Sequence, residues 1–254
     1  MSETRPVAIV TGSSSGVGAA TVRQLSAKGW NVTINYSRSD AAAEAVAEDC
    51  RAAGADALVM RANVAEDADC RALVQSTVER FGRLDALVNN AGTTKFVDHG
   101  NLEGLSAEDF QHIYGVNTVG AFQMTRAAAL PLKASGRAAV VMVASIAGVK
   151  GIGSSIAYAA SKGAMITMTK SLARVLGPEV RVNAVCPGFI QGDWLREGMG
   201  PEVYDRSKAF LENSVPLKVT ATADTVAESI IALIESVSLV TGETLLLDGG
   251  HHLM

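Results

Sequence analysis

Short apolar runs alternate with longer amphipathic segments along most of the chain. The apolar runs predict strands at residues 7–11, 32–36, 57–61, 86–89, 138–144, 180–186 and 244–247. The longer segments predict helices at residues 19–28, 41–53, 66–81, 110–132 and 223–235, and a further helix that carries residues 158–168. Strands and helices in strict alternation predict right-handed βαβ units. We therefore expect an α/β fold, with about seven strands in a parallel sheet that helices cover on both faces.

Residues 189–218 depart from this rhythm. Glycines and prolines there bracket short amphipathic pieces such as residues 204–211. An insertion of this kind after the carboxyl end of a strand suits a lid over a substrate. No linker and no internal repeat divides the chain, so we expect residues 1–254 to form a single domain with a substrate lid at 189–218.

Composition and charge narrow the class of protein. Hydrophobic residues make up 48% of the 254 residues and charged residues 19%, which indicates an ordered globule. The net charge of -4 gives no support for nucleic acid as a partner. The amino terminus lacks a signal-like pattern, and no run approaches the ~18 apolar residues of a membrane span. We therefore expect a cytoplasmic protein with no membrane partner.

The cysteines and histidines do not form a recognisable metal motif. Cys50, Cys70 and Cys186 are far apart in the sequence, and this pattern is typical of free thiols in a reducing compartment. His251 and His252 are adjacent, which makes a poor metal site. We expect no metal, and we interpret the tail at 248–254 as an interface segment of an oligomer.

A glycine-rich loop joins the first predicted strand to the first predicted helix. Glycines let the backbone approach a ligand closely, and free N–H groups at a helix start attract a pyrophosphate. The flanking strand and helix are the context that this motif requires. The predicted dinucleotide contacts in this loop are Gly12, Ser14, Ser15, Gly16, Val17 and Gly18.

The end of the second predicted strand indicates which dinucleotide binds. A site that prefers NAD usually offers a carboxylate there for the ribose hydroxyls. This chain has Tyr36, Ser37 and Arg38 instead, and a guanidinium beside a hydroxyl suits a 2′-phosphate. We therefore predict NADP(H) rather than NAD(H). The alternative is that Arg38 is only a solvated surface arginine.

Three polar features follow later strands or lie among apolar residues. Asn89-Asn90-Ala91-Gly92 ends the fourth predicted strand, and Ser145 follows the fifth. Open α/β sheets bind their ligands at the carboxyl ends of the strands, so a binding role is expected for both. Asn117 lies in a fairly apolar helical stretch, where a buried amide needs partners.

Tyr158 and Lys162 are four residues apart on a predicted helix, so their side chains should leave the same helix face. An ammonium about 5 Å from a phenol, at an effective dielectric of ~20, favours the phenolate by ~3 kcal/mol, or roughly two pKa units. We therefore expect Tyr158 to exchange a proton near neutral pH.

In their order and spacing these motifs resemble the short-chain dehydrogenase/reductase family, and the 3-oxoacyl reductases within it. The motifs that carry the resemblance are Thr11-Gly12-x-x-x-Gly16-x-Gly18, Asn89-Asn90-Ala91-Gly92, Asn117, Ser145, Tyr158-x-x-x-Lys162 and Pro187-Gly188. The resemblance implies a Rossmann-type, doubly wound sheet of strand order 3-2-1-4-5-6-7. It also implies a nicotinamide cofactor, a small-molecule carbonyl or alcohol substrate, and a homotetramer or homodimer.

The resemblance also assigns roles to residues. It implies that Tyr158 is the general acid or base while hydride passes between NADP(H) and a ketone or secondary alcohol. Lys162 would lower the pKa of Tyr158 and hold the nicotinamide ribose, Ser145 would orient the substrate oxygen, and Asn117 would hold a water that relays protons. The further cofactor contacts that it implies are Asn63, Val64, Asn90, Ala91, Gly92, Tyr158, Lys162, Pro187, Gly188 and Ile190.

Two departures from the family pattern affect these contacts. Asn63 stands where the family often has aspartate, and Gly192 stands where a threonine is frequent, so the contacts to adenine and to the carboxamide are altered. Two alternatives stay open: an alcohol dehydrogenase that prefers NAD, and a dinucleotide-binding regulatory protein without catalysis. For the substrate pocket we expect an apolar lining and a ligand of modest size. The expected lining residues are Val149, Gly151, Ile152, Gly153, Phe189, Trp194, Leu195 and the loop around Phe96.

Overall fold

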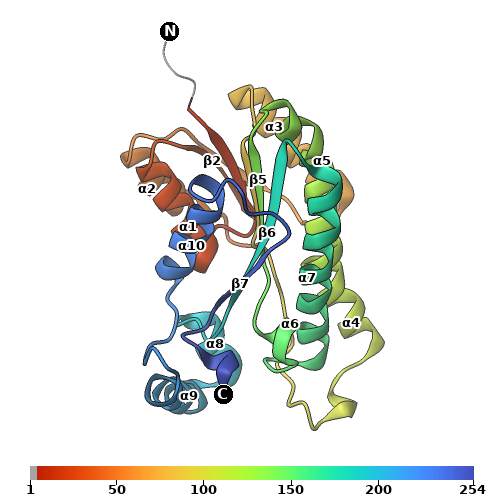
Figure 1. The fold of residues 1–254 in the computed structure, drawn as a ribbon, viewed down its shortest axis with the longest axis vertical. Helices are drawn as coiled ribbons and strands as arrows, with labels where there is room; N and C mark the ends of the chain where they lie inside the picture. Colours follow the sequence, from red (N-terminus) through yellow and green to blue (C-terminus); the bar gives the residue numbers. More distant parts are fainter. Residues whose placement is uncertain (1–4) are drawn as a thin grey trace.

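One parallel sheet forms the middle layer of the molecule in the computed structural model, which describes residues 5–254 (Figure 1). Its seven strands follow the order β3-β2-β1-β4-β5-β6-β7. They are β1 (Val7–Val10), β2 (Asn31–Tyr36), β3 (Ala57–Arg61), β4 (Ala86–Asn89), β5 (Ala138–Val143), β6 (Val180–Pro187) and β7 (Thr244–Leu247). The predicted fold class and strand order are confirmed.

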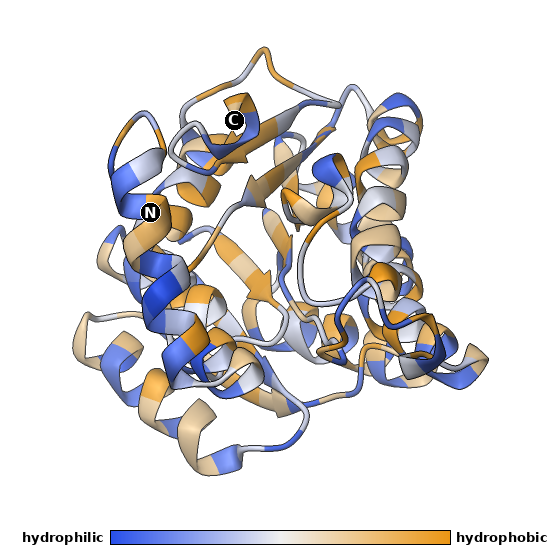
Figure 2. Ribbon diagram, turned by 90° about the horizontal axis from the view of Figure 1, so that it is seen from below, coloured by the Kyte–Doolittle hydropathy of each residue, from blue (hydrophilic) through white to orange (hydrophobic). Residues whose placement is uncertain are grey.

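Helices cover both faces of the sheet (Figure 1). On one face lie α1 (Gly16–Ala27), α2 (Asp40–Ala52) and α10 (Ala223–Glu235). On the other lie α3 (Asp67–Phe81), α4 (Ala107–Tyr114), α5 (Ala121–Ala134) and α7 (Ile156–Leu176). Figure 2 shows apolar colour on the central strands and polar colour on the outer sides of the helices.

Alternate residues of each central strand enter two separate hydrophobic cores. In β1, Ala8 and Val10 pack with α1, α2 and α10, whereas Val7 and Ile9 pack with α3, α5 and α7. Successive side chains of a strand point to opposite faces, so a sheet that is covered on both faces needs a continuous apolar run. This requirement explains why the short apolar runs marked the strands correctly.

The helix predicted at 110–132 is longer and less regular than expected. It begins at Ala107, because the Ser106 side chain and Asp109 form a capping box at its start. A π-helical segment, η2 (Gly115–Gly120), then separates α4 from α5. π-Helical turns inside α-helices often occur at functional sites, and this one carries Asn117.

The carboxyl ends of the strands all lie at the lower end of the molecule in Figure 1. Four helical elements gather at this edge, together with the chain terminus: α6 (Ala147–Lys150), α8 (Asp193–Met199), α9 (Pro201–Ser214) and η3 (His251–Leu253). The Lys150 ammonium joins two of them, since it donates to the carbonyl of His251 at 2.9 Å. Across residues 5–254, no helix combines the length and apolarity needed to cross a membrane. The same residues contain no group of three or more His, Cys, Asp or Glu side chains placed to hold a metal ion.

Candidate active site

Buried amides hold the glycine-rich loop against the end of the sheet. The Asn90 side chain donates to the carbonyls of Thr11 at 2.9 Å and Gly12 at 3.0 Å. The Asn35 side chain accepts the N–H of Gly12 at 3.1 Å and donates to the carbonyl of Ala62 at 3.0 Å. Asn90 therefore supports the loop through hydrogen bonds to its backbone. Asn35 also supports the loop, and it is a site residue that the sequence analysis missed. Its signal was an amide inside an apolar strand.

The helix that follows this loop begins three residues earlier than predicted, at Gly16 rather than residue 19. A Cβ on Gly18 would lie 2.6 Å from Asn90 Nδ2 and 2.6 Å from the carbonyl oxygen of Gly12. Only glycine lets the first turn of α1 wind this close to the loop. The Ser15 side chain makes no capping hydrogen bond, and the first turn carries no acidic residue. The free N–H groups at this helix start therefore fit a pyrophosphate.

Replacing Gly18 with alanine should weaken both the fold and the cofactor site. Overpacking of this kind costs about 1–3 kcal/mol, so we expect a melting temperature several degrees lower and NADPH affinity at least about tenfold weaker. Thermal unfolding and cofactor fluorescence titration measure the two effects. Gly115→Ala is the matched control, because a Cβ at Gly115 meets nothing within 4 Å. Equal behaviour of the two variants would contradict the close-packing argument.

The end of β2 presents the three residues predicted to select the cofactor. Ser37 and Arg38 are exposed, and the Arg38 guanidinium forms no hydrogen bond or ion pair with residues 5–254. Tyr36 is partly buried, and a hydrogen bond to the Asp40 carboxylate raises the pKa of its phenol. Asp40 was not foreseen, because its role depends on the start of α2 folding back towards Tyr36.

The other predicted cofactor residues lie along the same edge of the sheet. Asn63 is exposed after β3, whereas Val64 is buried. Ala91 packs against the loop, since a Cβ on Gly12 would lie 3.0 Å from its Cα. At the far side, Pro187 ends β6, Gly188 follows it, and Ile190 pairs with Ala221 in an isolated bridge.

Ser145, Tyr158 and Lys162 come together at the junction of β5 and α7. Ser155 caps α7 by accepting the N–H of Tyr158 at 3.3 Å, which fixes the start of the helix. The Ser145 hydroxyl is close enough to the Tyr158 phenol to act on its pKa. One helical turn later, the Lys162 ammonium lies 5.6 Å from the centre of the Tyr158 ring and donates to the carbonyl of Val143 at 2.7 Å.

Burial controls the protonation of this pair. Desolvation raises the pKa of Tyr158 to about 12, although the Ser145 hydroxyl acts in the opposite direction. Desolvation also lowers the pKa of Lys162 to about 8. The expectation that Lys162 brings Tyr158 near neutral pH is therefore wrong for the cofactor-free chain, because the ammonium is itself buried and bonds to a backbone carbonyl. Tyr158 is instead a protonated phenol, ready to donate.

Asn117 lies beside this pair. Its side chain accepts the N–H of Thr93 at 2.8 Å and donates to the carbonyl of Thr93 and the hydroxyl of Ser161, both at 3.0 Å. A Cβ on Gly92 would lie 3.5 Å from Asn117 Oδ1 and 3.6 Å from Lys162 Nζ. The amide oxygen and the ammonium therefore border the same small space next to Gly92.

Comparison with known proteins agrees with this arrangement. A family model described as enoyl-(acyl carrier protein) reductase matches residues 12–252. A solved structure described as a short-chain dehydrogenase/reductase from Burkholderia xenovorans superimposes with a TM-score of 0.91 at 39% identity, covering 99% of this chain and 100% of that one. The chain belongs to the short-chain dehydrogenase/reductase family. The family is an oxidoreductase family that binds a nicotinamide dinucleotide.

Two curated relatives within the short-chain dehydrogenase/reductase family are named for keto substrates. One, from Streptomyces violaceoruber, is named as ketoacyl reductase 2 of the granaticin polyketide synthase; it is 43% identical over 98% of this chain and 97% of its own length. The other is a 3-oxoacyl-(acyl-carrier-protein) reductase from Synechocystis sp.; it is 36% identical over 97% of both chains.

In this short-chain dehydrogenase/reductase the segment after β6 reaches the Tyr158 ring. The Trp194 ring in α8 lies 6.1 Å from the Tyr158 ring and 5.6 Å from the Phe96 ring, measured between centroids. Among the expected pocket residues, Trp194 and Phe96 are thus beside Tyr158. A Cβ on Gly153 would lie 3.8 Å from Tyr158 Cδ1, so this glycine borders the ring as well.

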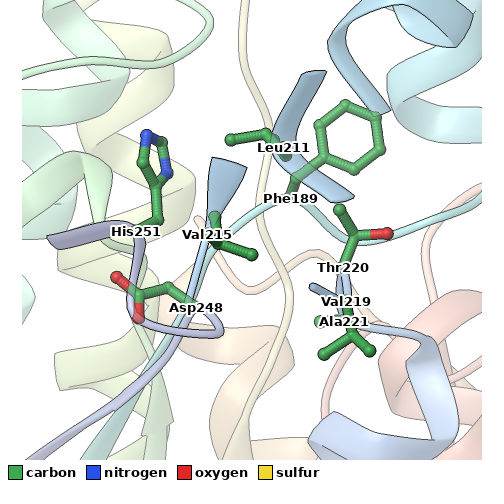
Figure 3. A pocket seen from close by; sticks show the side chains of 8 residues that line it. All are labelled: Phe189, Leu211, Val215, Val219, Thr220, Ala221, Asp248 and His251. Atoms are coloured by element: carbon green, nitrogen blue, oxygen red, sulfur yellow. The ribbon is translucent and has the colours of Figure 1, made fainter. Parts of the chain in front are cut away.

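Phe189, another of the expected pocket residues, borders a separate cavity. It stacks on Tyr204 at 5.1 Å between ring centroids and lines a pocket between residues 189–221 and the C-terminal turn (Figure 3). His251 and Asp248 lie on one side of this pocket, with Phe189 and Thr220 on the other (Figure 3). The lining contains none of the four residues predicted to be catalytic. The pocket therefore lies between the end of α9 and the C-terminal turn. It is distinct from the surface beside Tyr158.

Proposed function

We propose that this chain is an NADP(H)-dependent ketone reductase in which Tyr158 is the general acid. The observation that carries the proposal is the position of the Lys162 ammonium, 5.6 Å from the centre of the Tyr158 ring on the same helix, together with the influence of Ser145 on the Tyr158 phenol. The printed names of the relatives support a keto substrate. In this proposal residues 189–218 act as the substrate lid.

The bound cofactor would supply the hydride, and the residues of the chain would supply alignment and the proton. The start of α1 would hold the pyrophosphate, and Gly92, Pro187, Gly188 and Ile190 would border the nicotinamide half. Ser145 would hold the carbonyl oxygen by its hydroxyl. Tyr158 would donate its phenolic proton to that oxygen, where negative charge develops as hydride arrives.

Lys162 and Asn117 would complete the proton path. The Lys162 ammonium would stabilise the phenolate that forms when Tyr158 has given up its proton. A water in the space beside Gly92 could bond to both Asn117 Oδ1 and Lys162 Nζ, and would reprotonate the pair from solvent. The same groups run the reverse oxidation of a secondary alcohol when Tyr158 starts as the phenolate.

A panel of ketones tests the reaction class. Purified protein with NADPH should oxidise the cofactor, followed at its absorbance, in the presence of cyclic or acyclic ketones and not in their absence. Binding of NADPH without turnover on any ketone would refute the reductase and leave a dinucleotide-binding regulatory protein. Turnover only of secondary alcohols with NAD would favour the alternative dehydrogenase.

Replacing Arg38 with alanine should remove the preference for NADPH. An exposed guanidinium that bonds to a phosphate contributes about 1–2 kcal/mol, so NADPH affinity should fall about tenfold while NADH affinity changes little. Fluorescence titration of wild type and variant with both cofactors gives the four dissociation constants. Arg174→Ala, at an exposed arginine near the end of α7, is the control and should leave all four unchanged. If wild type binds NADH as well as NADPH, Arg38 is only a surface charge.

A further inference from the structure

Trp194 presents a large apolar surface next to the phenol of Tyr158. The tryptophan is 51% exposed, although its ring centroid lies only 6.1 Å from that of Tyr158, with the two rings tilted by 48°. Ligand sites are lined mainly by hydrophobic and aromatic side chains around a few polar groups, and an indole beside a phenol fits that description. The open part of this indole is therefore a candidate contact for the substrate.

Phe96 also packs against the indole. The two rings pack at 5.6 Å between centroids with a tilt of 59°. Phe96 also lies directly on the backbone of α8, since a Cβ on Gly198 would fall 2.0 Å from its ring carbon Cε2. Trp194 and Gly198 are four residues apart and share one helix face, so Phe96 packs along that face. The loop after β4 and helix α8 together fix the position of the indole.

The segment that borders the Tyr158 ring at Gly153 also carries exposed aliphatic side chains. Gly153 borders the Tyr158 ring, and its neighbour Ile152 is 37% exposed. Val149, in α6, is 50% exposed. None of these side chains carries a charge or a strong hydrogen-bonding group. A ligand in front of Tyr158 would therefore meet the Trp194 indole and the backbone at Gly153 beside the Ser145 and Tyr158 hydroxyls.

We propose that Trp194 determines substrate specificity by stacking on a flat ring, so that the site prefers an aryl-fused cyclic ketone to the same cyclic ketone without an aromatic ring. The inference rests on the proposed ketone reduction, because the carbonyl oxygen must lie at Ser145 and Tyr158. The fused ring then lies against the open part of the indole. Aromatic pairs prefer offset or tilted contacts, and a half-exposed indole permits either.

Two matched substrates and two variants test this preference. Cyclohexanone and 2-tetralone share a cyclic ketone and differ by the fused benzene ring. In Trp194→Ala, kcat/KM should fall about tenfold for 2-tetralone and by less than about twofold for cyclohexanone, which is the effect of one lost aromatic pair. Trp194→Phe should keep most of the activity on 2-tetralone. An equal fall for both ketones, or no fall for either, would overturn the proposal.

A binding measurement separates this proposal from the reaction itself. The chain has two tryptophans, and Trp30 is buried with its indole N–H bonded to Glu235 at 2.8 Å. Trp30→Phe should leave both kcat/KM values unchanged, and Trp194 is then the sole indole fluorophore. With NADP+ present, 2-tetralone should quench its fluorescence in a saturable way. If neither ketone is reduced although the cofactor binds, the proposed function fails. The fluorescence titration still tests the stacking role of Trp194: saturable quenching by 2-tetralone supports that role, and the absence of quenching overturns it.

Discussion

Tyr158→Phe should lower kcat for ketone reduction by about 10²–10⁴-fold, the usual contribution of a positioned general acid. The change removes one oxygen and leaves the ring that packs against Trp194 and Gly153. Because the phenol is desolvated and its pKa is raised to about 12, the wild-type group carries its proton throughout the neutral range. The variant therefore loses the proton donor without losing a charge, and we expect its melting temperature and NADPH affinity to stay close to wild type.

Steady-state kinetics and a cofactor titration on the same preparation check this prediction. Tyr114→Phe is the matched control, since Tyr114 is partly buried in α4 and its phenol forms no hydrogen bond with residues 5–254. Its kcat should equal that of wild type. A Tyr158→Phe enzyme that retained more than about a tenth of the wild-type kcat would show that the proton comes from another group.

Most of the fold could be predicted from the sequence because the sheet is buried on both faces. Strands such as β5, in which all six residues are buried, must be continuous apolar runs, and these stand out between amphipathic helices. The spacing of Tyr158 and Lys162 was equally informative, since an α-helix places residues four apart on one face. Both predictions use only local geometry.

The features that were missed depend on contacts between distant segments. Asn35 bonds to Gly12 across 23 residues, and Asn117 bonds to Thr93 across 24, and the sequence pattern gives no sign of either partner. The π-helical segment that carries Asn117 was also unexpected, because the hydrophobic period of 110–132 is that of a continuous α-helix. The contact between Trp194 and Tyr158 joins the segment after β6 to α7, and periodicity cannot specify such a contact.

The prediction of a near-neutral pKa for Tyr158 was wrong for a related reason. Charge and spacing gave an attraction between phenolate and ammonium, but the burial of both groups opposes it and is the larger effect. Lys162 is nearly fully buried, and its hydrogen-bond acceptors are the Val143 carbonyl and the Met165 sulfur. The structure thus holds a costly charge at the point where the proposed reaction needs one, as functional sites often do.

Lys162→Met should consequently abolish reduction and still leave a folded, more stable protein. Lowering the pKa of the ammonium from 10.5 to about 8 corresponds to a burial penalty of roughly 3 kcal/mol below pH 8. Methionine removes this penalty, while the loss of the hydrogen bond to Val143 offsets part of it. We expect a net gain of about 1–2 kcal/mol, or several degrees in melting temperature, together with a fall in kcat of at least about 10²-fold. Lys170→Met, which makes the same change at an exposed lysine of α7, should show neither effect.

The pH dependence separates the charge of Lys162 from its bulk. In wild type, the unfolded chain binds more protons than the native one between pH 8 and 10.5, so the free energy of unfolding should gain roughly 3 kcal/mol from this group across that range. Lys162→Met should lack this rise. In the same way, kcat/KM for reduction should fall above pH about 8, where Lys162 loses its proton while Tyr158 keeps its own up to about 12. A wild-type profile that is flat to pH 10 would show that the ammonium charge is not required for the proton transfer.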